Sequence, residues 1–355
     1  VNQDSSTGNR QQAGEVSPGS REGQPSAAVP GALEVRVLDV GQGDSILVRA
    51  PRGWTLLVDG GNEEQGPSLV ARLRELGVTR IDCLVATHPH ADHIGGLDDV
   101  LSAFPVRQVF APRVVASSSA YERLLLAVQA RGLKVTPAAA GVELPVPAEE
   151  RVGAEFLAPR ADSHENLNEA SAVLRLTFGR AAVLLCGDAG LASEGRILAS
   201  GAGVRADVIK LGHHGSTDAS GKAFLQAVQP RWAAISVGAG NPYGHPHAET
   251  LARLLAMGVS VLRTDLDGEL VFRSDGVTVA ADTSPARDRA SATVAAPRRP
   301  NPEATLGPGY VGNLRSKRFH LPSCTGLPTE HNRVYFATRQ QALDAGYTPC
   351  GTCQP

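Results

Sequence analysis

The 355-residue sequence lacks several features that would place a protein in a function class at once. Its 34 Lys and Arg residues are balanced by 36 Asp and Glu residues, and the resulting net charge of -2 excludes a uniformly basic nucleic-acid coat. No run of about 18 apolar residues occurs, so no segment is predicted to span a membrane. Methionine occurs once, at Met257, and the chain begins with Val1. A removed signal peptide, a non-standard start or trimming would each explain that beginning.

Cysteine is also scarce, because five cysteines in a chain of this length do not make a disulfide scaffold. Cys83 and Cys186 lie within apolar runs and are predicted to be small core residues. Cys324, Cys350 and Cys353 instead crowd into the C-terminal end of the chain. That cluster requires a separate explanation.

Composition divides the chain into four segments. Residues 1–32 are rich in Ser, Gly, Gln and Pro and almost free of large apolar side chains, which predicts a disordered tail. Residues 33–280 mix strand-like and helix-like patterns in two roughly similar halves, which predicts an α/β domain of two sheets with helices outside. Residues 281–307 return to Pro, Ala, Ser and Arg and are predicted to be a linker. Residues 308–355 form a module too short for a large core.

The strongest functional pattern is His88-Pro89-His90-Ala91-Asp92-His93, directly after a near-continuous apolar strand predicted at 81–88. Imidazole nitrogens and carboxylate oxygens are ligands of divalent zinc or manganese. One such histidine alone is more often a surface or capping residue, but three with an aspartate at this spacing favour a metal site. Asp188 and the pair His213-His214 also end buried strands, so we expect them at the same sheet edge.

At this point the sequence resembles the metallo-β-lactamase fold superfamily, and within it the soluble hydrolase domain of ComEC-type DNA-uptake (competence) proteins. Six blocks between about Leu33 and Ala280 carry the resemblance in the family's order. They are LDVGQGDS (38–45), DGG (59–61), THPHADHIGG (87–96), CGD (186–188), KLGHHGS (210–216) and NPYGHP (241–246).

The resemblance implies a four-layer αββα sandwich with two divalent metal ions, zinc or manganese, at the sheet edges. Carried over by residue, the ligands are His88 and His90 for the first metal, Asp92 and His93 for the second, and Asp188 as a bridge. His213 would complete the second site, and it is preferred to His214 because it comes first after the strand.

The sequence departs from the superfamily's pattern at one ligand of the first metal. A further histidine is usual just before the hairpin that leads to the Gly-Asp, but residues 166–171 read Asn-Leu-Asn-Glu-Ala-Ser. ComEC-type relatives similarly show Asn and Ser there. His164, slightly earlier in the chain, is one candidate replacement, and a weakly held first metal is the alternative.

These ligands predict hydrolysis by a metal-activated water, because a pair of cations lowers the pKa of water and clamps a phosphoryl oxygen. Asp92 would be both a ligand and a group that orients the water. His245 would hold the phosphoryl group or protonate the leaving oxygen, or else it is a structural histidine of a turn. The candidate substrate-binding residues are His214, Ser216 and Asn241, although a plain turn explains Gly215-Ser216 equally well. The expected supporting carboxylates, which bond ligand histidines or stabilise turns, are Asp39, Asp44 and Asp59.

The C-terminal module pairs His320-x3-Cys324 with Cys350-x2-Cys353, which is the layout of a closed structural zinc site. It resembles the small Ada-type metal-binding module, with His320 in place of a fourth cysteine. A disulfide that leaves one odd thiol is the alternative if the protein is exported. The module carries five Arg or Lys residues against Glu330 and Asp344, and its aromatic residues, Phe319 among them, suit either nucleic-acid contact or a small core.

Together these patterns predict a metal-dependent hydrolase of a phosphodiester, with DNA as the expected substrate. The alternatives are a hydrolase of a small phosphodiester of the phosphorylcholine type or of a lactone, and a non-catalytic DNA-binding relative. No protein partner can be inferred, and a monomer is expected. The polar tail favours a secreted or cell-envelope protein, while the zinc cluster is equally compatible with the cytosol.

Overall fold

The computed structural model describes residues 31–160 and 166–282, and in the C-terminal segment residues 310–313, 316–321, 324–328, 333–336, 339–344 and 347–353. The chain divides into two compact units. The larger unit contains the described residues up to Ala239 and those of Pro246–Thr283, and the smaller contains Gly240–His245 and the described residues after Ser284. The predicted tail at 1–32 and linker at 281–307 lie outside the described residues except for 31, 32, 281 and 282.

The first sheet of the larger unit has eight strands in the order β14-β13-β1-β2-β3-β4-β5-β6. The strands are β1 (Leu33–Val37), β2 (Ile46–Arg49), β3 (Thr55–Val58), β4 (Ile81–Val85), β5 (Val106–Ala111), β6 (Val135–Pro137), β13 (Leu270–Ser274) and β14 (Val279–Asp282). Strands β3 to β6 run parallel, and the others pair antiparallel. Every residue of β4 is buried because both faces of the sheet are covered, which explains its continuous apolar run.

The second sheet has six strands in the order β12-β11-β10-β9-β8-β7. They are β7 (Val152–Ala158), β8 (Val173–Phe178), β9 (Ala181–Leu185), β10 (Val208–Lys210), β11 (Trp232–Ile235) and β12 (Ser260–Arg263). Strands β8 and β9 form the predicted antiparallel hairpin, while β9 to β12 are parallel to one another. A short helical turn, α8 (Thr264–Asp267), follows β12.

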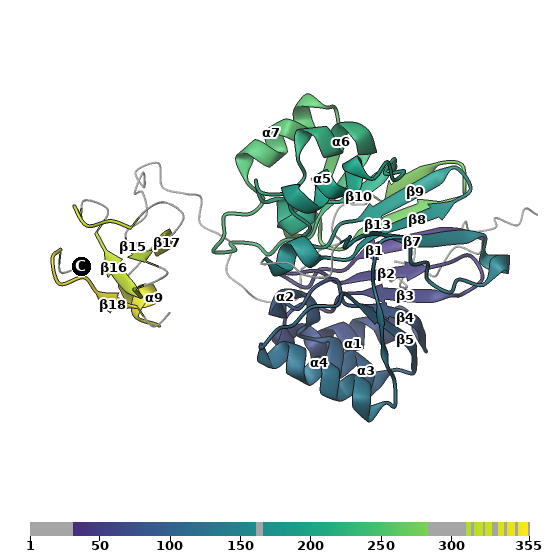
Figure 1. Ribbon diagram of the computed structural model, residues 1–355, viewed down its shortest axis with the longest axis horizontal. Coiled ribbons are helices and arrows are strands. Elements are labelled where there is room, and N and C mark those ends of the chain that lie inside the picture. The colour runs from purple at the N-terminus through teal and green to yellow at the C-terminus, as the bar shows by residue number, and fades with distance from the viewer. Residues whose placement is uncertain are drawn as a thin grey trace, which may run out of the picture. The chain divides into compact units, whose positions relative to one another are not determined.

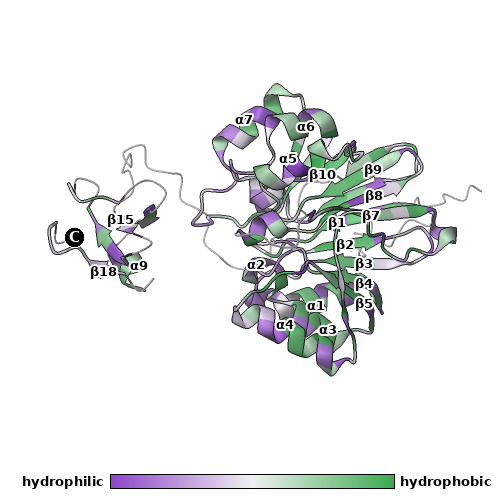
Figure 2. Cartoon of the chain, in the orientation of Figure 1, coloured by the Kyte–Doolittle hydropathy of each residue, from purple (hydrophilic) through white to green (hydrophobic). Residues whose placement is uncertain are grey.

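Helices cover the outer face of each sheet, so that the larger unit is a four-layer αββα sandwich (Figure 1). The helices α1 (Gly66–Glu75), α3 (Leu97–Ala103) and α4 (Ser119–Ala130) pack on the first sheet, and α5 (Leu191–Ala199), α6 (Lys222–Val228) and α7 (Ala248–Ala256) pack on the second. Apolar side chains fill all three interfaces between these layers, and Figure 2 shows the strands as mainly hydrophobic. This is the fold that the resemblance implied.

The parallel strands end at a common edge, and this edge carries the polar residues predicted as ligands. His88 follows β4 in the first sheet, whereas Asp188 follows β9 and His213-His214 follow β10 in the second. A backbone hydrogen bond of 2.9 Å from the N–H of Ala172 to the carbonyl of Thr87 joins the two sheets there. The sandwich therefore brings distant parts of the sequence to one place.

The smaller unit contains a four-stranded sheet in the order β17-β15-β16-β18 and one helix. Its elements are β15 (Tyr310–Asn313), β16 (Arg318–His320), β17 (Arg333–Phe336), α9 (Arg339–Asp344) and β18 (Thr348–Pro349). Phe319, Ala342 and Tyr347 form a buried apolar cluster in it. Phe319 has no exposed surface, so of the two roles considered for it the structure assigns it to the core.

The core between the two sheets predicts a test of the sandwich. Phe156 is fully buried there, and its ring centroid lies 6.0 Å from that of Phe110 on the opposite sheet. Phe156→Ala should lower the free energy of unfolding by about 3–5 kcal/mol because it leaves a cavity. Urea unfolding followed by circular dichroism measures this, with Val115→Ala as the control, since Val115 is 96% exposed. Equal stability of the two variants would contradict the assigned core.

Candidate metal centres

The turn after β4 presents the first group of candidate ligands. His88 is buried, and its Nε2 lies 3.0 Å from Nδ1 of His90. His90 precedes the single-turn helix α2 (Ala91–Ile94), which contains Asp92 and His93 in its first turn. The short helix turns the side chain of His93 inward, where it is fully buried.

Asp188 lies at the middle of the cluster because the backbone of the second sheet comes very close to the first. Gly187 has a φ of 52°, and a Cβ built there would lie 3.0 Å from Cβ of Thr87. The N–H of Asp188 donates to Oγ of Ser171 at 3.1 Å. Oδ1 of Asp188 is 3.2 Å from Nε2 of His93, and Oδ2 is 3.7 Å from Nε2 of His88. Asp188 can therefore bridge two ligand groups.

His213 and His214 are consecutive, and both side chains face Asp188. Both residues have left-handed backbones, with φ of 49° and 52°. This conformation costs a non-glycine residue about 1–2 kcal/mol. Nε2 of His214 is 3.6 Å from Oδ1 of Asp188, whereas Nε2 of His213 is 3.9 Å from Oδ2.

The geometry favours a different assignment of these two histidines from the one expected from the sequence. His214 was expected to bind substrate and His213 to complete the second metal site. Nε2 of His214 instead lies 3.3 Å from Oδ2 of Asp92, so His214 belongs with Asp92 and His93. The left-handed backbone of both residues explains why His214, the second histidine after the strand, reaches Asp92 and His93. The order of the two histidines after the strand does not determine this.

Buried acceptors orient the ligand histidines from behind. Oδ2 of Asp59 is 2.7 Å from Nδ1 of His93, and the same carboxylate accepts hydrogen bonds from the N–H and Oγ1 of Thr87. Oδ1 of Asp44 is 3.5 Å from Nδ1 of His214, and Oδ2 pairs with the buried ammonium of Lys210. Such contacts fix the ring so that its other nitrogen faces the metal.

Asp39, Ser216 and Asn241 form hydrogen bonds within local turns. Oδ1 of Asp39 accepts from the N–H of Gly41 at 3.3 Å. The N–H of Ser216 donates to the carbonyl of His213 at 2.8 Å, as in a turn, and a contact of Ser216 with substrate stays a prediction. The Asn241 side chain bonds both the N–H and the carbonyl of His245. The ring of His245 stacks on Tyr243 at 5.7 Å, and its catalytic role stays a prediction.

Electrostatics explain why the buried acids and histidines tolerate one another. Burial lowers the pKa of His93, but the carboxylates of Asp188, Asp59 and Asp92 outweigh that effect and raise it well above its ordinary value. Burial likewise opposes the charge on His214, and Asp188 and Asp44 raise its pKa to about 9. Conversely, burial raises the pKa of Asp188, but His93 and His214 hold it well below its usual range. A divalent cation would replace these protons, so metal binding is expected to release them.

The residues present fit a divalent metal. One ligand atom each from Asp44, His93, Asp188 and His214 lies within 4.8 Å of all the others, and all four residues are buried. Nε2 of His93 and Oδ1 of Asp188 are buried atoms that make no hydrogen bond within the described part of the chain. Nitrogen and oxygen donors suit zinc and manganese alike.

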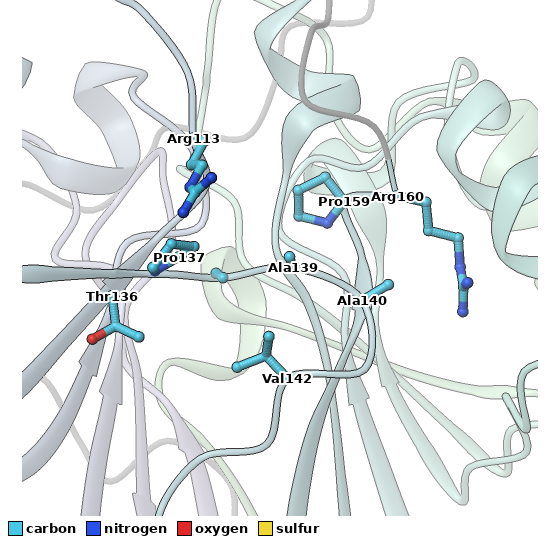
Figure 3. Close-up of a pocket in the computed structure, with 9 residues that line it drawn as sticks. Arg113, Thr136, Pro137, Ala139, Ala140, Val142, Pro159 and Arg160 are labelled. Atoms are coloured by element: carbon cyan, nitrogen blue, oxygen red, sulfur yellow. The ribbon is translucent and has the colours of Figure 1, made fainter.

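A pocket of about 550 Å³ lies at the carboxyl ends of β5 and β6 (Figure 3). These strands are parallel to β4, so they end on the side of the sandwich where His88 follows β4. Segments that follow the carboxyl ends of β5, β6 and β7 supply its lining, which includes Arg113 and Arg160. Both arginines are exposed, and no acidic side chain is among the lining residues. The pocket therefore offers positive charge to a ligand.

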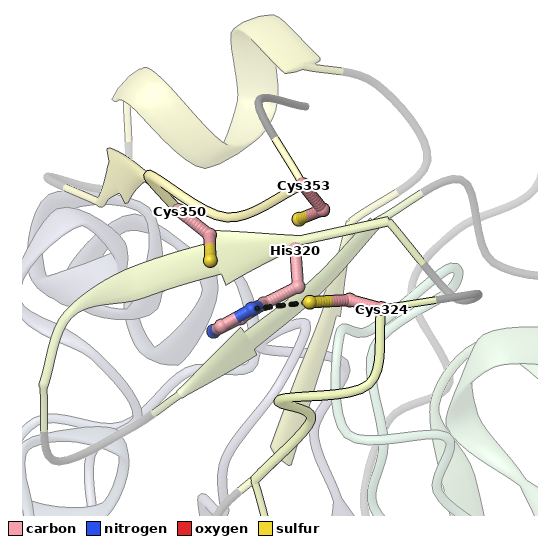
Figure 4. A group of neighbouring side chains, drawn as sticks. All are labelled: His320, Cys324, Cys350 and Cys353. Carbon is pink, nitrogen blue, oxygen red and sulfur yellow. Dashed lines mark hydrogen bonds between the residues drawn. The ribbon is translucent and has the colours of Figure 1, made fainter.

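The second candidate metal centre lies in the smaller unit. Strands β16 and β18 are parallel, so His320 at the end of β16 and Cys350 just after β18 lie at the same edge. Cys324 and Cys353 complete a group whose ligand atoms all lie within 4.8 Å of one another (Figure 4). The three cysteines are free thiols, so the disulfide alternative does not describe this structure. Backbone N–H groups of Cys353 and Thr352 lower the pKa of Cys350 to about 7, which favours the thiolate that binds zinc.

The family model of the Metallo-beta-lactamase superfamily matches residues 38–238, which include every candidate ligand of the larger unit. The chain belongs to this superfamily. It is accordingly a metal-dependent hydrolase in the broad sense. A second family model, the metal binding domain of Ada, matches residues 298–355. The Ada-type match agrees with the zinc-compatible group of the smaller unit.

Curated relatives agree with this placement. The chain is 33% identical over 257 residues to ComE operon protein 3 of Bacillus subtilis, which covers 68% of this chain and 33% of that one. It is 33% identical over 250 residues to Competence protein ComA of Neisseria gonorrhoeae, which covers 70% of this chain and 33% of that one. The chain thus spans about a third of the length of these relatives.

Among solved structures, the chain is similar to CmlA, a diiron beta-hydroxylase from Streptomyces venezuelae. The TM-score is 0.46 at 16% identity, and the match covers 71% of this chain and 55% of that one. None of the helices in the described residues has the length and hydropathy needed to cross a bilayer.

The position of Asp188 among four histidines predicts the outcome of its removal. Asp188→Ala should abolish hydrolysis and release the metals of the larger unit, because histidines of both ligand groups face this carboxylate. Elemental analysis and an activity assay measure both effects, with Asp98→Ala as a control at a partly exposed aspartate on α3. Full activity in Asp188→Ala would exclude the bridging role.

The zinc-compatible group predicts an independent effect in the smaller unit. Cys350→Ala should lose one zinc ion and unfold that unit alone, because metal binding supplies much of the folding free energy of so small a core. Zinc content and limited proteolysis measure this result. Cys186→Ala, at a buried cysteine of the larger unit, should keep the zinc. An unchanged zinc content in Cys350→Ala would be inconsistent with the site.

Proposed function

We propose that this chain is a phosphodiesterase that cleaves DNA. Family membership supports metal-dependent hydrolysis, and three further observations favour this narrower activity: the bridged ligand cluster, the arginine-lined pocket and the competence relatives. The proposal extends the family assignment in substrate and reaction class.

The ligand cluster supports hydrolysis of a phosphoester. When bound, a pair of divalent cations supplies an activated water and neutralises charge that develops on a phosphoryl oxygen. The chain's own residues hold this arrangement, because Asp188 lies between the histidines and buried Asp59 fixes the ring of His93. Asp92 has a carboxylate oxygen 3.3 Å from His214 and remains partly exposed, so it can also orient water. We assign to His245 the task of donating a proton to the leaving oxygen.

The arginine-lined pocket is the observation that carries the choice of substrate. Arg113 and Arg160 line this pocket (Figure 3), whose strands β5 and β6 end on the same side of the sandwich as β4. Guanidinium groups bind phosphate oxygens in a bidentate manner, whereas a neutral lactone offers them no such partner. A polyanionic strand would pair its further phosphates with these side chains while one phosphate is at the metals. The pocket therefore favours a polynucleotide over a small neutral ester.

The relatives and the smaller unit add support for DNA. One relative is named as a competence protein, and the chain resembles the hydrolase domain of DNA-uptake proteins. We further propose that the basic C-terminal module helps to hold the polymer and that the protein works outside the cytoplasm, in the secreted fraction or the cell envelope. We propose that the chain is organised as a tail, a hydrolase domain, a linker and a zinc module.

The substrate proposal is tested with single- and double-stranded DNA beside bis-para-nitrophenyl phosphate, in the presence of Mn²⁺ or Zn²⁺. The double variant Arg113→Ala/Arg160→Ala should bind DNA more weakly and lose about one unit of salt-dependence slope per arginine that contacts phosphate. Its turnover of the small phosphodiester should be unchanged. Arg180→Ala is the matched control, because Arg180 is exposed at the β8–β9 turn, at the opposite edge of the sheet.

Each alternative gives a different result in these assays. Turnover of bis-para-nitrophenyl phosphate with intact DNA would indicate a hydrolase of small phosphodiesters, and turnover of a lactone alone would indicate a lactonase. DNA binding without turnover, together with almost no metal in the larger unit, would indicate a non-catalytic relative.

A further inference from the structure

The first metal lacks an evident third histidine. Nε2 of His88 and Nδ1 of His90 lie 3.0 Å apart, and Oδ2 of Asp188 is 3.7 Å from His88. The segment that precedes β8 supplies no imidazole within the described residues. Ser171 of this segment instead accepts a hydrogen bond from the N–H of Asp188, and Nδ2 of Asn168 lies 3.4 Å from Nε2 of His213.

The two carboxylate oxygens of Asp188 divide the surrounding histidines into two pairs. Oδ1 faces Nε2 of His93 at 3.2 Å and of His214 at 3.6 Å. Oδ2 faces Nε2 of His88 at 3.7 Å and of His213 at 3.9 Å. If the carboxylate gave one oxygen to each of two cations, the histidines that face the same oxygen would bind the same cation.

Asp218 holds the ring of His213 in the orientation that a ligand requires. Its two carboxylate oxygens lie 2.9 and 3.1 Å from Nδ1 of His213. A carboxylate at one ring nitrogen keeps the proton there and leaves the lone pair of the other nitrogen for a metal. Asp59 stands in the same relation to Nδ1 of His93 in the second group. His213 thus has the supporting contact of a ligand.

We propose that His213 is a ligand of the first metal, where it takes the place of the histidine absent from residues 166–171, and that Asp218 orients it. The two sites then have matching protein ligands around a shared Asp188. The first has His88, His90 and His213, and the second has Asp92, His93 and His214. The consecutive left-handed backbone at 213 and 214 is what lets neighbouring residues serve different metals.

Metal counting on the full chain tests this assignment. It rests on the two-metal centre of the proposed function and does not depend on the substrate. The wild type should hold three ions, two at Asp188 and one at the cysteines. His213→Asn should hold two, and asparagine is chosen because it tolerates a left-handed backbone. Cooperative thermal unfolding of each variant shows that the fold is kept.

Double variants identify which metal His213 holds. His88→Ala/His213→Asn should still hold two ions, because both changes affect the same metal. His213→Asn/His214→Ala should hold one, the zinc of the smaller unit. The reverse pattern would assign His213 to the second metal and overturn the proposal. A wild-type count of two that falls to one in Cys350→Ala would instead reject the two-metal centre itself, whatever the role of His213.

Two single variants complete the test. Asp218→Asn should weaken the binding of one metal by about 10–100-fold in a competitive chelator titration and leave the others unchanged, as expected for a positioning residue. Unchanged affinity would overturn the role of Asp218. His164→Ala should keep all three ions. Loss of an ion in His164→Ala, with three retained in His213→Asn, would make His164 the missing ligand instead.

Discussion

The candidate site of the larger unit depends on one carboxylate that faces side chains of both sheets. Asp188 comes from the second sheet, and its oxygens face His88 and His93 from the first sheet and His213 and His214 from the second. Burying so many ionisable groups is unfavourable unless opposite charges compensate one another. The close approach of Gly187 to Thr87 makes this compensation possible, because it brings the carboxylate between the rings.

Much of this arrangement could be predicted from the sequence because it depends on strand ends. Apolar runs identified β4, β9 and β10, and parallel strands place the residues that follow them at one edge. The HxHxDH block is also local, so its spacing alone indicates a metal site. Asp59 was predictable as a supporting carboxylate only through the family resemblance, since nothing in the DGG block relates it to His93, 34 residues later.

Other features could not be predicted because they depend on backbone conformation or long-range packing. His213 and His214 are identical neighbours in the sequence, so the sequence does not show in which direction each ring points. Their directions follow from the left-handed φ angles of both residues. Asp218 lies outside the six blocks that carry the resemblance, and Lys210 lies in the KLGHHGS block without an expected role. Their roles arise from contacts with His213 and Asp44. In the smaller unit, by contrast, the ligand pairs alone predicted the cluster, because its sheet is too small to place them elsewhere.

The ligands of the larger unit come from both layers of the sandwich, and this has a consequence for its mechanical behaviour. The two sheets are held together by apolar packing over most of their area, but at the edge with the candidate ligands they also meet through polar side chains and backbone hydrogen bonds such as that from Ala172 to Thr87. Cations bound there would cross-link the two layers. The two sheets could then separate at that edge only if the ions were released. Metal binding would therefore control both catalytic activity and the association of the two sheets.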